Sequence, residues 1–198
     1  IATFAQLREE VVTEVDLAGM LPRRSTIDRK TGAAEDDRFV ETRFLPAITQ
    51  RIRRGDRKLH RRRAIRGTIL DPISALFALR SVALEDAARF QMLLLNGTSL
   101  YDVRLRVVGR ERIYTRIGPR DAIRVDGVAH RVHEDGRRRV SGKRPRKVSL
   151  WFSADARRVP FRVRGDTKLG PVDVEITSYQ PPSSGLRVRA TLNEAPPD

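Results

Sequence analysis

The feature that most constrains the fold is the alternation of apolar and polar side chains along short segments. It is clearest in residues 100–108, where every second position is apolar: Tyr101, Val103, Leu105 and Val107. Successive side chains of a strand point to opposite faces, so this pattern predicts a half-buried strand. About a dozen such segments follow one another, mostly separated by tight turns such as Asn96-Gly97. Consecutive antiparallel strands of this kind close into barrels or curl into half-barrels.

One segment departs from the alternation and predicts a helix over residues 72–82. Asp71 can cap the first turn through its carboxylate, and Pro72 suits the first helical position, where its missing N–H costs nothing. Apolar residues then recur at helical spacing. They are Ile73, Leu76, Phe77 and Leu79. We therefore expect a mainly β fold: an antiparallel curled sheet, half-barrel or open β-barrel, with one helix packed on or in its concave face.

The chain has 198 residues and no composition break that demands two domains. We expect one β domain over 1–198, with flexible ends at residues 1–9 and 194–198 and an exposed basic loop at 134–146. Gly109 is expected to turn the chain between two strands, and a last strand is expected over 186–192. Because the chain begins with Ile1 rather than Met, we expect a signal peptide to have been removed.

Positive charge is concentrated in two stretches. The chain has 40 basic and 25 acidic residues, a net charge of +15. Residues 51–66 hold nine basic residues and one acid, and residues 137–147 hold seven basic residues and no acid. Such stretches form either solvated strands and loops, in a chain whose arginine content reflects a GC-rich genome, or a polyanion-binding surface. The candidate polyanion-binding residues are Arg51, Arg53, Arg54, Arg61, Arg62, Arg63, Arg137, Arg138, Arg139, Lys143, Arg144, Arg146 and Lys147.

The sequence predicts no catalytic constellation, no metal site and no cofactor. It has no cysteine and three histidines, of which His130 and His133 point to opposite faces of their expected strand. Neither a nucleophile elbow nor a phosphate-binding glycine loop is present. Nucleic acid is a disfavoured partner, because the basic stretches lack the aromatic side chains on which bases stack. Anionic lipid head groups need no such platform.

Several short motifs over residues 70–180 resemble one bacterial family. They are Asp71-Pro72-Ile73-Ser74-Ala75-Leu76, Ala78-Leu79-Arg80, Asn96-Gly97, Leu100-Tyr101-Asp102-Val103, Val108-Gly109-Arg110-Glu111-Arg112, Gly118, Val148-Ser149-Leu150-Trp151-Phe152-Ser153, Asp155, Arg157, Arg158, Pro160, Leu169-Gly170 and Val172. In order and spacing this set is similar to the exported proteins grouped as domain of unknown function 3108. The first 65 residues match only as alternating strands.

The resemblance implies export to the periplasm or outer envelope of a Gram-negative bacterium, and it implies no known reaction. More distantly, the strand pattern with an inserted helix looks like the half-barrel of lipoprotein carriers of the outer-membrane localisation type, whose apolar concave face is plugged by helices. The motif residues Asp71, Arg80, Trp151, Asp155, Arg158 and Pro160 either specify the fold or form a site. An ion pair of Arg80 or Arg158 with Asp155 would favour a structural role.

Three functional hypotheses follow from these observations. The leading one is a non-enzymatic envelope protein that binds an apolar or amphipathic ligand, a lipid or a lipidated partner, in a curved cavity. Its expected wall is Ile73, Leu76, Phe77, Tyr101, Leu105, Leu150, Trp151 and Phe152. The second is a polyanion-binding module for anionic lipid head groups, lipopolysaccharide or nucleic acid. The third is a structural or assembly protein without a small ligand. The sequence makes no prediction of the oligomeric state.

Overall fold

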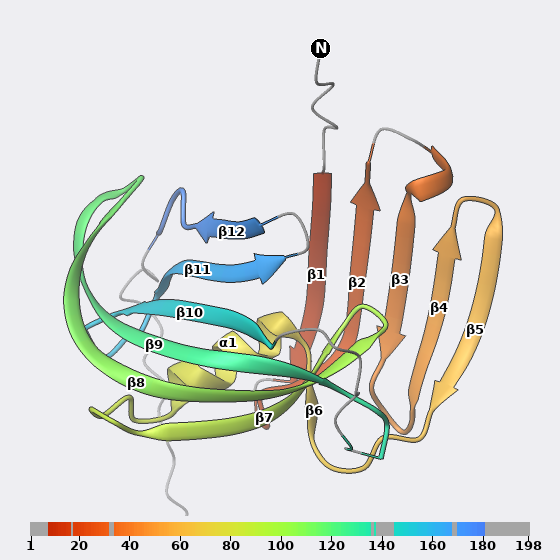
Figure 1. Cartoon of the computed structure of the whole chain (residues 1–198), viewed down its shortest axis with the longest axis horizontal. Helices are drawn as coiled ribbons and strands as arrows, with labels where there is room; N and C mark the ends of the chain where they lie inside the picture. The colour runs from red at the N-terminus through yellow and green to blue at the C-terminus, as the bar shows by residue number, and fades with distance from the viewer. Residues whose placement is uncertain are drawn as a thin grey trace, which may run out of the picture.

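The strands form two sheets that meet near the single α-helix of the described residues (Figure 1). The computed structural model describes residues 8–16, 18–31, 34–135, 137, 145–167 and 170–180. The expected strand at 186–192 and the expected flexible end at 194–198 lie outside these ranges, as does most of the expected basic loop at 134–146. Residues 8 and 9, which fall within the expected N-terminal flexible end, belong to the first strand.

Sheet A is a five-stranded antiparallel meander in chain order. It consists of β1 (Arg8–Asp16), β2 (Leu21–Lys30), β3 (Arg38–Arg43), β4 (Ile48–Arg54) and β5 (Arg57–Arg63), with the short 3-10 helix η1 (Ala34–Asp36) before β3. On β4 the buried Ile48 and Gln50 alternate with the exposed Thr49 and Arg51. One face of the sheet is therefore turned toward the rest of the protein and the other toward solvent.

Sheet B has seven strands and curls into a half-barrel, which confirms the predicted fold class (Figure 1). Its order is β12-β11-β10-β9-β8-β7-β6, and each pair is antiparallel except β6 and β7. The strands are β6 (Ile69–Leu70), β7 (Arg89–Asn96), β8 (Ser99–Thr115), β9 (Gly118–Val132), β10 (Arg146–Ser153), β11 (Pro160–Thr167) and β12 (Gly170–Glu175).

The long strands β8 and β9 bend at two glycines. The expected turn at Gly109 is wrong, because β8 runs through it and only the register with β9 shifts between Val107 and Gly109. Gly109 has a φ of 142°, a conformation that side-chain-bearing residues rarely adopt, so glycine permits a bulge there. At Gly127 a Cβ atom would overlap the carbonyl oxygen of Arg104 on the neighbouring strand. Both glycines let the sheet curl without losing strand pairing.

Helix α1 (Pro72–Ser81) lies on the concave face of sheet B, as predicted (Figure 1). The Ser74 backbone N–H donates to Asp71 Oδ1 at 2.7 Å, and the Asp71 N–H donates to Ser74 Oγ at 2.9 Å, which completes a capping box. Leu79 and Leu84 then enter the largest apolar cluster. Its other buried members come from the curled sheet: Tyr101, Val103, Leu105, Val107, Ile123, Val125, Leu150 and Phe152.

The inner face of sheet A holds the tip of the β7–β8 hairpin. Gln50 Nε2 donates to the Gly97 carbonyl at 2.8 Å, and an Arg63 guanidinium nitrogen donates to the Thr98 carbonyl at 3.0 Å. Phe44, which follows β3, and Ile48 of β4 share a buried cluster with Leu95, Leu100 and Val132 of sheet B. Polar contacts at the turn and apolar contacts beside it therefore fix the two sheets against each other.

The turn after β10 docks on the C-terminal end of α1. Asp155 accepts a hydrogen bond from Ser153 Oγ at 2.6 Å and pairs with Arg157 at 2.6 Å. Arg80 donates to the Arg157 carbonyl, and Arg158 donates to the Val82 carbonyl. Pairing of Arg80 or Arg158 with Asp155 is therefore not observed. These arginines instead join the helix end to the turn through backbone carbonyls.

Acid should remove the contribution of this turn to stability. The Ser153 hydrogen bond, followed by Arg157, holds the pKa of Asp155 below its ordinary value. A carboxyl whose pKa is lower in the folded state stabilises the protein fully above its ordinary pKa, and this contribution is lost as the pH falls through the folded value. We expect Asp155→Asn to lower the free energy of unfolding at about pH 6 and to lower it less at about pH 3. Urea unfolding at both pH values tests this, and a pH-independent difference would contradict it.

Candidate anion-binding face

Strand alternation gathers cationic side chains on the solvent side of sheet A. We call this surface the basic face: Arg24, Arg43, Arg51, Arg53, Lys58, His60 and Arg62. The strand register determines which of these residues lie side by side on neighbouring strands. Arg43 of β3 lies opposite Thr49 of β4, which lies opposite Arg62 of β5. Three successive strands therefore present two guanidinium groups with a hydroxyl between them.

One buried carboxylate lies among three of these arginines. Glu41 is 6% exposed. Its carboxylate is 3.0 Å from Arg24 Nε, 3.4 Å from Arg43 Nε and 4.0 Å from an Arg51 guanidinium nitrogen. Arg24 also pairs with Glu14 at 3.7 Å. Glu41 aligns the arginines on the surface. Glu41 and Glu14 together bring two negative charges to these three arginines, so one positive charge is left uncompensated.

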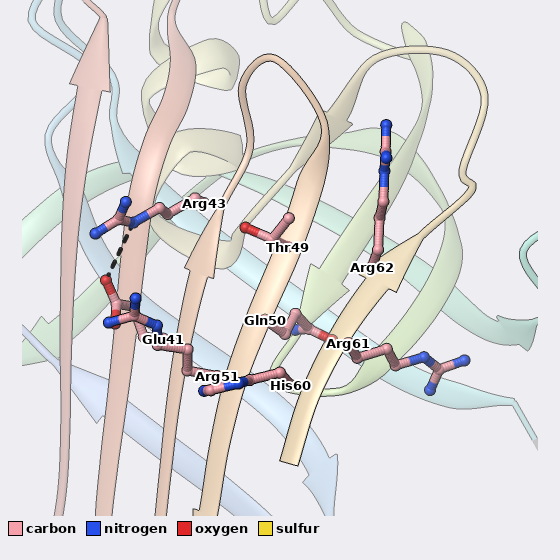
Figure 2. Close-up of a pocket in the computed structure, with 8 residues that line it drawn as sticks. All are labelled: Glu41, Arg43, Thr49, Gln50, Arg51, His60, Arg61 and Arg62. Carbon is pink, nitrogen blue, oxygen red and sulfur yellow. Dashed lines mark hydrogen bonds and ion pairs between the residues drawn. The ribbon is translucent and has the colours of Figure 1, made fainter.

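A shallow hollow of about 400 Å³ lies over this part of the face (Figure 2). Figure 2 shows Thr49 between Arg43 and Arg62, and it shows the Arg61 side chain extending away from the other cations. The residues that line the hollow are Glu41, Arg43, Thr49, Gln50, Arg51, His60, Arg61 and Arg62. Guanidinium forks and a hydroxyl donor at these positions are the groups that bind phosphate oxygens.

Three cations of the basic face have no carboxylate partner among the described residues: Arg53, Lys58 and Arg62. The Arg53 guanidinium instead lies over the Phe39 ring, 5.7 Å from its centre. Uncompensated charges on one flat sheet raise the local concentration of anions. These three positive charges therefore give this surface a positive potential.

The predicted basic residues of β4 and β5 divide between the two faces of sheet A. Arg51, Arg53 and Arg62 belong to the basic face. Arg54 pairs with Asp36 at 2.9 Å. Arg61 and Arg63 lie on the inner side and both pair with Glu134, and the Arg63 side chain is only 5% exposed.

The second basic stretch contributes nothing to the basic face among the described residues. Arg137 pairs with Asp135 at 2.6 Å, and the Arg146 guanidinium lies over the Tyr101 ring, 5.4 Å from its centre. Lys147 belongs to β10 of sheet B. The other predicted residues, Arg138, Arg139, Lys143 and Arg144, lie outside the described residues.

The sequence reasoning missed Arg24, Arg43 and Glu41. These residues lie outside the two basic stretches and join the basic face only through the pairing of β2, β3 and β4. Alternation along β3 indicates that Glu41 and Arg43 share a face, but it does not say which strands lie beside them.

The expected apolar wall is largely packed. Tyr101, Leu105, Leu150 and Phe152 are buried in the cluster that contains Leu79. Leu76 packs against the same cluster and is partly exposed, as are Ile73 and Phe77 on the helix. The structure thus brings most of this predicted set together, with α1 itself occupying the concave face.

Trp151 lies on the opposite face of β10 from this cluster. Arg124 and Arg162 approach its ring to 5.6 and 5.7 Å, and its indole N–H donates to Glu111 Oε1 at 2.5 Å. The residue is 5% exposed and packs in a third apolar cluster with Ile113, Ala122, Val159 and Phe161. Trp151 is therefore a core residue of the convex side and not part of the predicted wall.

The fold and the site define a class: a mainly β protein with a helix-filled half-barrel and a second, arginine-rich sheet. The chain belongs to the family described as "Protein of unknown function (DUF3108)", whose model matches residues 1–177. Comparisons with curated proteins and with solved structures found no match. Within the described ranges no cluster of His, Asp and Glu could hold a metal ion. No helix in that part of the chain combines the length and the apolar character that crossing a membrane requires.

Proposed function

We propose that this protein is a non-enzymatic protein of the cell envelope that binds the phosphate-bearing head groups of an anionic membrane surface through the basic face. The observation that carries the proposal is the row of Arg43, Thr49 and Arg62 beside the Glu41 arginine cluster. Each cation near an anionic surface contributes about 1 kcal/mol of attraction. Several cations on one sheet therefore suffice for reversible binding.

A membrane surface suits the basic face better than a nucleic acid does. The outward-facing side chains of β2 to β5 include one aromatic ring other than His60, that of Phe39, and Arg53 already lies over it. Single-stranded nucleic acids are held largely by stacking on aromatic side chains. Head-group phosphates need only donors and positive charge. The family resemblance further supports the periplasm or the outer envelope as the location, which cell fractionation would test.

Charge reversal on the basic face should abolish most membrane binding. We expect the double variant Arg43→Glu and Arg62→Glu to lower affinity for vesicles of phosphatidylglycerol and phosphatidylcholine at least about tenfold, because four units of charge change at the contact. The measurement is co-sedimentation with these vesicles, with pure phosphatidylcholine as the neutral surface. Wild-type binding should weaken as salt is added.

The matched control carries the same change in net charge at the far end of the molecule. Arg116→Glu and Arg120→Glu lie at the tip of the β8–β9 hairpin, remote from β4 and β5 (Figure 1). Equal losses of vesicle affinity in both double variants would contradict binding through the basic face. Absence of wild-type binding to the anionic vesicles would overturn the proposal. Preference for a single-stranded oligonucleotide in competition would identify nucleic acid as the ligand instead.

An apolar or amphipathic ligand in the half-barrel, including a lipidated partner, is a second candidate. Its support is that Val172 and Val174 of β12 are 48% and 62% exposed and continue the apolar row of Val163 on the same face. A ligand that reached Tyr101 and Leu150 would have to displace α1. Native mass spectrometry of detergent-free protein after a high-salt wash tests it, because a retained lipid-sized mass would favour this candidate over the basic face.

A further inference from the structure

We infer that the loop between β3 and β4 inserts its tip, Leu45, into the anionic membrane surface that the basic face contacts. This inference rests on the proposed function and adds an orientation to it. Leu45 is 64% exposed, the most exposed large aliphatic side chain among the described residues. The next residue, Pro46, is also exposed. A single exposed leucine is ordinary on a protein surface, so the argument depends on its setting.

The loop is held firmly from both sides. Phe44 and Ile48 are buried in the cluster that joins the two sheets. The Phe44 backbone N–H donates to the Arg23 carbonyl at 3.0 Å. A leucine between two such anchors is presented to solvent without a neighbouring side chain to cover it. Its insertion therefore requires no rearrangement of the fold.

The strands that flank this apolar tip carry arginines. Arg43 lies two residues before Leu45, and Arg62 lies in the same strand row as Arg43. Arg23, whose carbonyl holds the loop, has a side chain that is 66% exposed and is paired with Asp16 at 2.9 Å. An apolar tip that follows a row of cations matches the bilayer interface, where phosphates lie just outside the acyl chains. An apolar side chain next to cations fits an anionic bilayer, which offers both phosphates and acyl chains, better than it fits a soluble phosphate compound.

The absence of cysteine from the sequence allows one site to be labelled cleanly. We would replace Leu45 by cysteine and attach a fluorophore whose emission shifts to the blue in an apolar environment. The control is Tyr114→Cys near the β8–β9 tip, where the side chain is 77% exposed and far from sheet A. With vesicles of phosphatidylglycerol and phosphatidylcholine, we expect a blue shift and a rise in emission at position 45 but not at position 114.

A second variant measures the contribution of the tip without a label. Leu45→Ser should lower vesicle affinity about five- to tenfold, because an aliphatic side chain loses its transfer out of water. Co-sedimentation of both labelled proteins with an unchanged spectrum at position 45 would overturn insertion and leave the proposed function standing. Equal spectral shifts at positions 45 and 114 would also overturn it. Failure of the wild type to sediment would overturn the proposed function itself.

Discussion

Replacing Asp71 by alanine should lower the free energy of unfolding by about 2–4 kcal/mol. Asp71 is 1% exposed and accepts from the Ser74 N–H, the Ser74 hydroxyl and the Thr13 hydroxyl. Alanine removes the helix cap and leaves the buried Ser74 N–H without its acceptor. The Ser74 and Thr13 hydroxyls keep only weaker acceptors, the carbonyl of residue 71 and Ser25 Oγ. Because Thr13 belongs to β1, the loss affects the contact of α1 with sheet A as well as the helix itself. Urea unfolding followed by circular dichroism measures the change.

Asp71→Asn is the matched control for this prediction. Asparagine is also a good helix cap, and its amide oxygen can accept from the Ser74 N–H. Its NH₂ group can donate to the Thr13 hydroxyl, which then acts as acceptor. We expect this variant to lose no more than about 1 kcal/mol. Unchanged stability of Asp71→Ala, combined with loss of vesicle binding, would show that Asp71 belongs to a site and not to the fold.

Truncation of Glu134 should lower the free energy of unfolding by about 2–3 kcal/mol, because it leaves the buried Arg63 without its counter-charge. Arg63 Nε lies 3.1 Å from Glu134 Oε1 as an ion pair, although its N–H finds no acceptor in hydrogen-bonding geometry. The same carboxylate accepts from the Ala64 N–H at 3.1 Å. Burial lowers the pKa of Arg63, and the negative charge of Glu134 acts in the opposite direction.

Two further variants distinguish the cost of leaving the buried Arg63 unpaired from the cost of losing an exposed ion pair. Arg61→Ala removes the exposed partner of the same carboxylate, 2.7 Å away, and should change stability by no more than about 0.5 kcal/mol. In Glu134→Ala combined with Arg63→Met no cation is left buried, so the double variant should be more stable than Glu134→Ala alone. Equal effects of Glu134→Ala and Arg61→Ala in urea unfolding would contradict this account.

Most of the motif residues that resemble the family have structural roles. Asp71 and Ser74 cap α1, and Gly97 forms the turn that Gln50 holds. Gly109 permits the bulge in β8. Through these contacts, the motif residues connect α1, sheet B and sheet A. The basic face lies outside the motif, in the first 65 residues, so the fold motif and the proposed site are separate.

Local sequence determined the strands, the helix and its cap. Alternation predicts which side chains of one strand share a face, and this held over residues 48–51 of β4 and 103–108 of β8, where buried and exposed residues alternate. The spacing of Ile73, Leu76 and Leu79 predicted α1 within one residue of its observed end. These features depend on contacts within a few residues, so a local pattern is sufficient to predict them.

Only the tertiary structure decided that the strands separate into two sheets and that Glu41 gathers arginines from β2, β3 and β4. The sequence shows a charge run at 51–66, but the fold buries Arg63 of that run and brings Arg24 and Arg43 to the basic face instead. Periodicity gives the direction of a side chain relative to its own strand. Strand pairing depends on contacts distant in sequence, which no local pattern encodes.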